Sequence, residues 1–194
     1  QICILTRQRV VGRTNGSSQY LLDICAFLVG RGFDVHMIVP SPSTMGRWPF
    51  IRLSDDMRIF KSIKFRGTIR IGRYIVTRDP RIALRAALGL LDRLLHRKGL
   101  LSRPLSKPAP YAIAAPLTRK DQLFLARTAP SIGDALIADY CFLTEAYPYA
   151  LRPDARRIVV MHDLFSSRSS QFDVLKAEDS VASLSLSDET EMLA

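Results

Sequence analysis

The chain opens with the alternation of apolar runs and amphipathic segments that is typical of an α/β sheet. Ile2–Leu5 is a continuous apolar run, as expected of a strand buried on both faces. After a polar loop, apolar residues recur at helical spacing from about residue 17 to Gly30. A second apolar, β-branched run over Phe33–Val39 predicts another strand. These forty residues therefore predict a βαβ unit with two parallel strands.

The middle of the chain is less regular. Met57–Phe65 alternates apolar and polar residues, which predicts a half-exposed strand, and Thr68–Val76 is expected to form another. Several prolines within Ser102–Pro116 indicate a linker or an extended surface segment. We therefore expect residues 43–116 to form a basic, irregular insertion.

The alternating pattern returns in the last third of the chain. It predicts a helix over Thr118–Thr128, a strand over Ala135–Tyr140, a short helix through Glu145 and Tyr149, and a buried strand over Arg157–Asp163. Helices that alternate with apolar strands specify an open parallel sheet with helices on both faces. With 194 residues, the chain is expected to form one α/β, Rossmann-like domain over 1–194.

Ligands of open parallel sheets bind at the carboxyl ends of the strands, near the point where the strand order reverses. In this sequence that rule selects the loop after Leu5, the corner at Asp139, and the pair His162 and Asp163. We take these three places as the candidate site.

The loop after the first strand does not carry a dinucleotide-binding fingerprint. Gly12 and Gly16 lack the G-x-G-x-x-G spacing, and no Gly-Lys-Ser/Thr occurs that would indicate a P-loop. What remains is Asn15, Gly16 and Ser17 at a helix N-terminus, where backbone N–H groups can hold a phosphate. Alternatively, Gly16 only turns the chain and Ser17 caps the helix. Both interpretations stay open on the sequence.

The order of these motifs resembles a known family. The first strand, the glycine-bearing loop, and the segments 30–38, 134–140 and 158–163 are similar to the N-terminal, acceptor-side domain of family 4 glycosyltransferases, which have the GT-B fold. The resemblance implies a Rossmann-like domain of an enzyme that transfers a sugar from a nucleotide-sugar to an acceptor, with retention and without a metal. It also implies that the C-terminal donor-binding domain is missing from this sequence and that the domain alone is inactive.

The resemblance assigns roles to individual residues. Gly16 would lie near the donor diphosphate, and His162 would be the catalytic residue that orients the transferred sugar. From its position alone, His162 is equally compatible with a structural histidine. Asp139 is expected to cap the following turn, with contact to an acceptor hydroxyl as the alternative. Asp163 lies beside His162, and Arg168 is a candidate for binding an anionic acceptor.

The sequence predicts no metal site and no cofactor besides the nucleotide-sugar substrate. Cys3, Cys25 and Cys141 are far apart in apolar segments, so we expect buried thiols in a reducing compartment. The three histidines are equally scattered. A cytoplasmic location is expected, with peripheral attachment at the inner face of the membrane.

Positive charge is concentrated in the middle of the chain. The net charge is +10, and residues 57–120 alone carry sixteen Lys or Arg against two acids. Such a region is either a solvated basic face or a surface for a polyanion. Within it, a basic helix over about 80–98 carries a stripe of leucines. If the stripe packs on the sheet, the arginines are an ordinary solvated face; if it is exposed, the helix suits an anionic membrane and a lipid-linked acceptor.

Two alternatives to the transferase remain. One is a non-enzymatic Rossmann-like module that binds a nucleotide or another small anion. The other is a basic polyanion-binding module that acts through residues 57–120. Specific nucleic-acid recognition is not expected, because few aromatic side chains lie among these charges.

Overall fold

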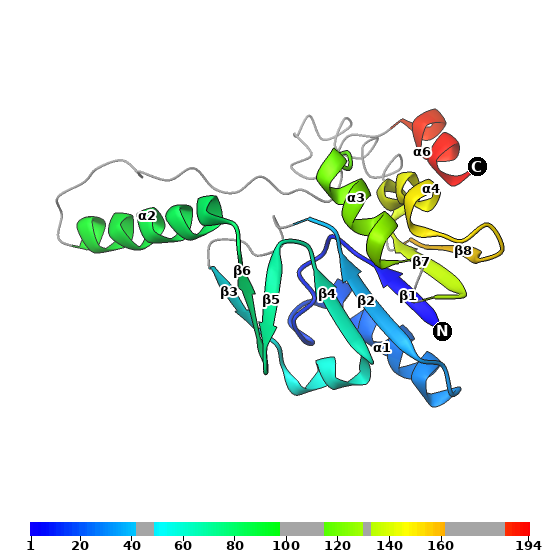
Figure 1. Ribbon diagram of the computed structural model, residues 1–194, viewed down its shortest axis with the longest axis horizontal. Coiled ribbons are helices and arrows are strands. Elements are labelled where there is room, and N and C mark those ends of the chain that lie inside the picture. The colour runs from blue at the N-terminus through cyan, green and yellow to red at the C-terminus, as the bar shows by residue number, and fades with distance from the viewer. Residues whose placement is uncertain (42–48, 98–114, 130–132, 162–184) are drawn as a thin grey trace, which may run out of the picture.

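A parallel five-stranded sheet forms the centre of the protein (Figure 1). The computed structural model describes residues 1–41, 49–97, 115–129, 133–161 and 185–194. The strands lie in the order β4-β2-β1-β7-β8, and every neighbouring pair is parallel. The order runs outward in both directions from β1, so it reverses between β1 and β7, as in Rossmann-like sheets. The strands are β1 (Ile2–Leu5), β2 (Val35–Val39), β4 (Ser62–Phe65), β7 (Ala135–Asp139) and β8 (Arg156–Val160).

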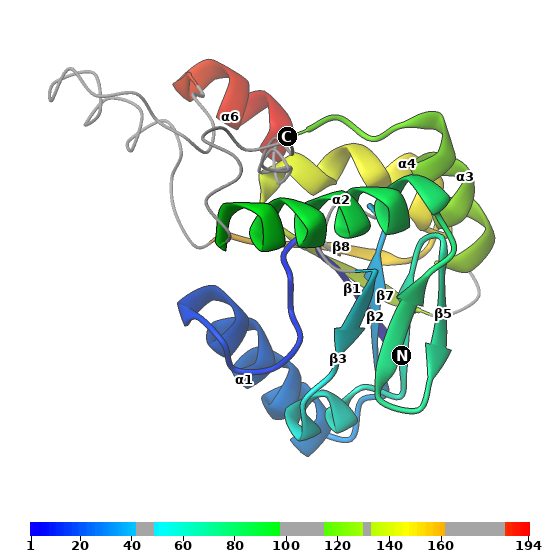
Figure 2. The same ribbon diagram turned by 90° about the vertical axis from the view of Figure 1, so that its left-hand side faces the viewer.

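Helices cover both faces of this sheet, because its central strands carry apolar side chains on both sides. From β1, Ile2 and Ile4 pack into one core together with α1, whereas Cys3 and Leu5 pack into the other core with Leu125 of α3. Figures 1 and 2 show the helices on the two sides of the sheet. They are α1 (Gly16–Gly30) on one face and α3 (Arg119–Thr128), the 3-10 helix η3 (Cys141–Ala146) and α4 (Tyr147–Ala150) on the other.

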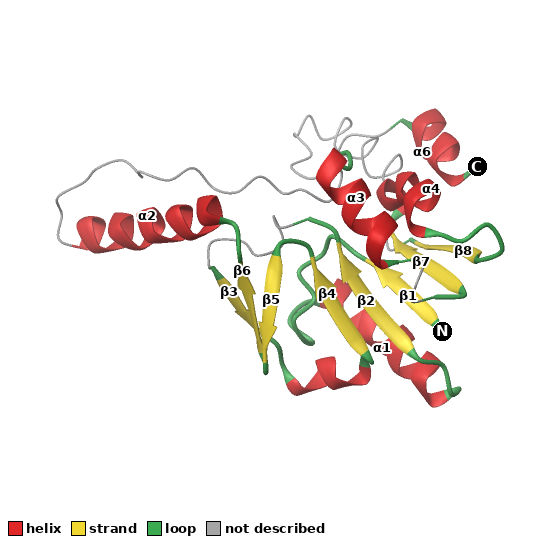
Figure 3. Cartoon of the chain, viewed as in Figure 1, coloured by secondary structure: helices red, strands yellow, loops and turns green. Residues whose placement is uncertain are grey.

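A second, smaller sheet lies beside β4 (Figure 3). It is antiparallel, in the order β3-β6-β5, with β3 (Phe50–Arg52), β5 (Thr68–Ile71) and β6 (Tyr74–Thr77). Ile51 and Ile75 face each other across it and are buried against the main core. The remaining elements are the 3-10 helix η2 (Asp55–Ile59), the long helix α2 (Pro80–Arg97) and α6 (Leu186–Leu193).

The middle of the chain differs from its sequence-based prediction. Met57–Phe65 is not one strand: Met57 lies in η2, and only Ser62–Phe65 is extended, as β4 of the main sheet. The strand expected over Thr68–Val76 is a hairpin, because Gly72 has φ +58° in the two-residue turn between β5 and β6. The described parts of residues 43–116 therefore hold regular structure, and one of their strands belongs to the parallel sheet.

Most other predicted elements are confirmed within one or two residues. The helix predicted to begin near residue 17 spans Gly16–Gly30, and the predicted strand over Ala135–Tyr140 is β7. The three cysteines are free and buried, as expected. The strand predicted over Arg157–Asp163 is β8, and residues 162–163 lie outside the described ranges. Among the described strands β8 is at the edge of the sheet rather than buried, and Ile158 is 40% exposed. Most of the linker expected over 102–116 lies outside the described residues.

His36 of β2 gives the protein a predicted pH dependence. It is buried, its Nδ1 lies 2.7 Å from Ser62 Oγ, and within the described chain its Nε2 has no hydrogen-bond partner. Burial lowers the pKa of His36 below its ordinary value of 6.5, against an opposing effect of Asp34. The unfolded chain therefore binds this proton more readily, and stability that is fully present above about pH 6.5 is lost as the pH falls through the lower folded value.

We expect the free energy of unfolding to decrease from about pH 7 to about pH 5, and His36→Gln to flatten this decrease. Urea titrations of both proteins across this range provide the measurement. Parallel pH profiles for the wild type and the variant would contradict the assignment to His36.

Candidate functional site

A capping box formed by Asn15 and Ser18 satisfies part of the N-terminus of α1. Asn15 is the N-cap, with an extended backbone, and its Oδ1 accepts the Ser18 N–H at 2.8 Å. In return, Ser18 Oγ accepts the Asn15 N–H at 3.0 Å. The cap is therefore Asn15, rather than Ser17 as the sequence suggested, because an asparagine side chain placed before the helix reaches the N3 amide directly.

The first two amides of the helix stay available. Among the described residues, no hydrogen-bond acceptor is found for the N–H groups of Gly16 and Ser17. A Cβ added to Gly16 would meet no atom within 4 Å, and Gly16 does not have a positive φ. Neither a turn nor close packing therefore requires glycine at this position. An anion that approaches these two amides would find open space and the positive end of the helix dipole.

Gly12, in the same loop, has the opposite character. Its φ is +150°, and an added Cβ would lie 2.2 Å from Oγ of Ser54. Ser54 also donates its amide to the Val11 carbonyl at 2.8 Å, so the loop is packed closely against the segment before η2. Close packing and a positive φ therefore require glycine at position 12, whereas position 16 has space for a side chain.

A buried hydrogen bond joins β1 and β7 where the strand order reverses. Thr6 Oγ1 donates to Asp139 Oδ2 at 2.5 Å, and both side chains are fully buried. The carboxylate is close enough to α1 to raise the pKa of Cys25, which burial and Asp139 together bring to about 12. The expected capping role differs from what is found: Tyr140 is the N-cap of η3, and no side-chain cap is present there. Asp139 instead holds the two strands together beneath the site.

Tyr140 follows Asp139 in an unusual backbone conformation. Its φ of 74° and ψ of 153° lie in a region that is almost restricted to glycine. Such a conformation costs about 1–3 kcal/mol and is typical of functional sites. The Tyr140 amide nevertheless donates to the Val160 carbonyl at 2.8 Å, which ties the corner to the end of β8.

Charged side chains, some of them buried, lie along the same edge of the sheet. Arg7 lies two residues after the end of β1, its side chain is buried, and its Nη2 lies 3.8 Å from Glu145 Oε1. Burial lowers the pKa of Arg7, and the carboxylates of Glu145 and Asp121 oppose this change. At the end of β4, Arg66 binds Asp121 at 2.6 Å and the Pro40 carbonyl at 2.7 Å. Positive and negative side chains thus form a continuous polar layer across the strand ends.

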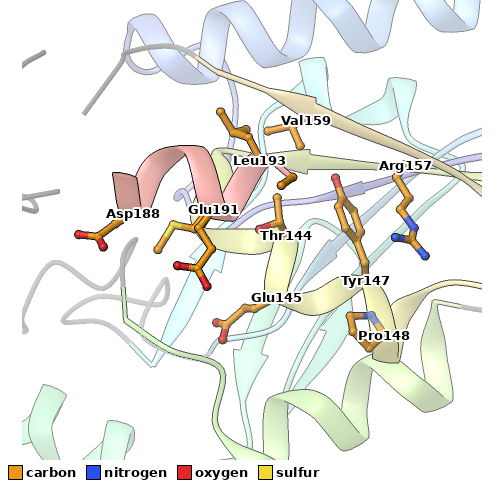
Figure 4. Close-up of a pocket in the computed structure, with 11 residues that line it drawn as sticks. Thr144, Glu145, Tyr147, Pro148, Arg157, Val159, Asp188, Glu191 and Leu193 are labelled. Carbon is orange, nitrogen blue, oxygen red and sulfur yellow. The ribbon is translucent and has the colours of Figure 1, made fainter. Parts of the chain in front are cut away.

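Glu145 connects this layer to a cavity of about 860 Å³ (Figure 4). The cavity size falls in the range of about 300–1,000 Å³ that is usual for small-molecule sites. Figure 4 shows Glu145, Tyr147 and Arg157 on one side and residues of α6 on the other. The Arg157 guanidinium lies 5.9 Å from the centre of the Tyr147 ring, and the Tyr147 hydroxyl donates to the Ile158 carbonyl at 3.0 Å.

The chemistry of this cavity suits a ligand with many hydroxyl groups. Asp188 and Glu191 of α6 add carboxylates to that of Glu145, and Arg157 adds a donor. Burial raises the pKa of Tyr147 to about 12, with Arg157 opposing, so the phenol stays protonated at neutral pH. Carboxylates accept hydrogen bonds from hydroxyl groups, and an aromatic ring offers an apolar face to a sugar ring.

The structure describes some of the site residues that the sequence predicted and not others. Four of them lie within the described residues. Asn15 is the cap of α1, and the amides of Gly16 and Ser17 begin that helix after the loop that follows β1. Asp139 lies where the strand order reverses. His162, Asp163 and Arg168 lie outside the described residues. The sequence reasoning passed over Arg7, Tyr140 and Glu145. For Arg7 the only signal was its place in the loop after the first strand.

Comparisons of the chain with known protein families, with curated proteins and with solved structures find no match. The class of protein therefore rests on the fold. The chain is an α/β protein with a Rossmann-like open parallel sheet flanked by helices.

Proposed function

We propose that this chain is the N-terminal, acceptor-side domain of a GT-B glycosyltransferase that resembles family 4. The observation that carries the proposal is the pair of available amides, at Gly16 and Ser17, at the start of the helix that follows β1. This helix begins after the strand at which the sheet order reverses, which is where open α/β sheets bind ligands. A departing nucleoside diphosphate is an anion of the kind that a helix N-terminus holds.

The remaining groups divide the work of sugar transfer. Glycosyl transfer passes through a state with positive charge on the sugar ring, so the enzyme must stabilise a leaving diphosphate and orient that ring. The Gly16 and Ser17 amides serve the diphosphate. The cavity beside Glu145 and Tyr147 serves a hydroxylated acceptor. By the family resemblance, His162 contacts the transferred sugar, with Asp163 beside it, and Arg168 contacts an anionic acceptor.

The reaction that we propose uses no metal and retains the anomeric configuration, as the family resemblance implies. The proposed substrate is a nucleotide-sugar, and its diphosphate would be shared with a second, donor-binding domain. The acceptor is a sugar or a lipid-linked sugar.

Replacing Gly16 with proline tests the helix N-terminus. Proline is favoured at the first helical position, and the extended Asn15 before it is compatible with proline, so the fold is expected to remain intact. The variant lacks one N–H donor, and a hydrogen bond to a charged group contributes about 1.5–3 kcal/mol. We therefore expect the affinity for inorganic pyrophosphate and for uridine diphosphate, measured by calorimetry, to fall by about tenfold or more.

Gly16→Ala is the matched control, because it keeps the N–H group and places a methyl in open space. It should bind more tightly than the proline variant. Equal affinity of the proline variant and the wild type would contradict a phosphate site at Gly16. The non-enzymatic module would show the same binding but no transfer. Sugar transfer by the chain joined to a donor-binding domain, lowered about 10²-fold by His162→Ala, separates the transferase from that alternative.

A further inference from the structure

Helix α2 turns its leucines away from the protein. At its start, Ile82 and Ala86 are buried, and Ile82 belongs to the main core. At about 100° per residue, the leucine stripe lies on the opposite side of the helix. Its members are between 42% and 63% exposed, and Figure 1 shows the helix projecting from the body. They are Leu84, Leu88, Leu91 and Leu94.

The small sheet next to α2 has an apolar outer face as well. Ile51 and Ile75 point to the core, so their strand neighbours lie on the other face. That outer face carries four large apolar side chains that are between 40% and 61% exposed. They are Phe50, Ile69, Ile71 and Tyr74, and the rings of Phe50 and Tyr74 meet edge to face at 6.2 Å.

Arginines accompany both apolar surfaces. Arg52, which pairs with Tyr74 on the outer face of the small sheet, and Arg81 of α2 are exposed. The whole stretch 57–120 has a net charge of +14. In Figure 1, α2 and the small sheet lie at the same end of the molecule, away from β7 and β8, and α2 contacts β6. We call the exposed residues of α2 and of β3, β5 and β6 named above the basic apolar surface.

We propose that the basic apolar surface docks on an anionic lipid bilayer. Leucines and aromatic rings beside arginines are the composition of an interfacial helix, whose apolar side enters the boundary of the acyl chains while its cations meet anionic headgroups. Within the described ranges, no helix has both the length and the apolar character of a transmembrane span. The attachment that we propose is a surface contact, and it is independent of the proposed sugar transfer.

Charge and composition favour this occupant over two others. Two copies of the chain that met through this surface would bring two strongly positive regions together, which opposes self-association. A nucleic acid would satisfy the arginines but leave the leucines of α2 in water. An anionic bilayer satisfies both kinds of side chain at once.

The test uses the full chain and sedimentation with vesicles of phosphatidylcholine alone or with about 30% phosphatidylserine. We expect binding only to the anionic vesicles, weakened when the salt rises from about 0.05 M to about 0.5 M. Replacing Leu84, Leu91 and Leu94 together with serine should lower the partition coefficient at least about tenfold. The matched control replaces three exposed leucines elsewhere: Leu123, Leu186 and Leu193.

A charge series completes the experiment. Gln at Arg52 and Arg81 should weaken binding at least about fivefold, whereas Gln at the exposed Arg127 and Arg156 should weaken it less. A wild-type chain that stays in the supernatant with anionic vesicles at low salt overturns the proposal. So does equal loss of binding in the two leucine variants, or a dimer in light scattering that the α2 leucine variant abolishes. Pyrophosphate binding is measured in parallel, so a failure here is distinct from a failure of the proposed function.

Discussion

Replacing Gly12 with alanine should destabilise the protein by about 2–6 kcal/mol. The added methyl would lie 2.2 Å from Oγ and 2.7 Å from Cβ of Ser54, so atoms of the loop or of Ser54 must move. Forcing an extra methyl into close-packed surroundings costs about 1–3 kcal/mol. A side chain at φ +150° adds backbone strain of about 1–3 kcal/mol. Denaturant titration measured by circular dichroism gives the total.

Gly16→Ala is the matched control for this experiment, since Gly16 lies at the end of the same loop, as the first residue of α1, but has open space and an ordinary φ. Its stability should stay within about 0.5 kcal/mol of the wild type or rise slightly. Ser54→Gly in the Gly12→Ala background removes the atoms that the methyl meets. It should recover the steric part of the loss and leave the part due to φ. Equal stabilities of Gly12→Ala and Gly16→Ala would show that the described loop packing is wrong.

The second large effect is expected at Asp139. Asp139→Ala removes the buried acceptor of the Thr6 hydroxyl, which lies 2.5 Å away, and leaves that hydroxyl without its partner at the strand reversal. A hydrogen bond to a charged group contributes about 1.5–3 kcal/mol, and a buried polar group left unsatisfied costs about 1–3 kcal/mol. We expect a loss of about 3 kcal/mol in the free energy of unfolding.

A double-mutant cycle with Thr6→Val isolates the bond itself. The coupling between the two positions should be about 1–3 kcal/mol, as for residues in direct contact. Asp154→Ala, which removes an exposed carboxylate, serves as the control and should change stability by less than about 0.5 kcal/mol. A coupling near zero would show that the hydrogen bond between Asp139 and Thr6 does not contribute to stability. The alternative that Asp139 contacts an acceptor hydroxyl would then be favoured.

Much of the candidate site was predictable, because it follows from where strands end. The apolar runs of β1 and β7 identified the loop that leads to Gly16 and the corner at Asp139. The identity of the helix cap was not predictable, since Asn15, Ser17 and Ser18 are all good capping residues and only the backbone conformation chooses between them. The partner of Asp139 was hidden for another reason: Thr6 is 133 positions away in the chain.

The layer of charged side chains across the strand ends could not be predicted from the sequence either. Arg7 reads as an ordinary loop arginine, and its burial depends on Glu145 and Asp121, which come from distant elements. Arg66 was placed in an irregular insertion, because nothing local showed that β4 joins the main sheet beside β2. Long-range pairing decides such contacts, and a single sequence carries no record of it.

Elements whose hydrophobic period matches only one kind of structure could be predicted from the amino-acid sequence alone. The continuous apolar runs of β1, β2 and β7 and the helical spacing of α1 have no equally good alternative, so class and parallel sheet follow from them. Tertiary structure decided the direction in which α2 faces and the position of β8. The leucine stripe of α2 suits a buried or an exposed helix equally well, and the burial of Ile82 and Ala86 turned the stripe outward. The apolar run of β8 likewise reads as a central strand, but no further strand among the described residues pairs with its outer side, so Ile158 stays partly exposed. Local periodicity specifies which side of an element is apolar, and only packing with the rest of the chain decides what that side meets.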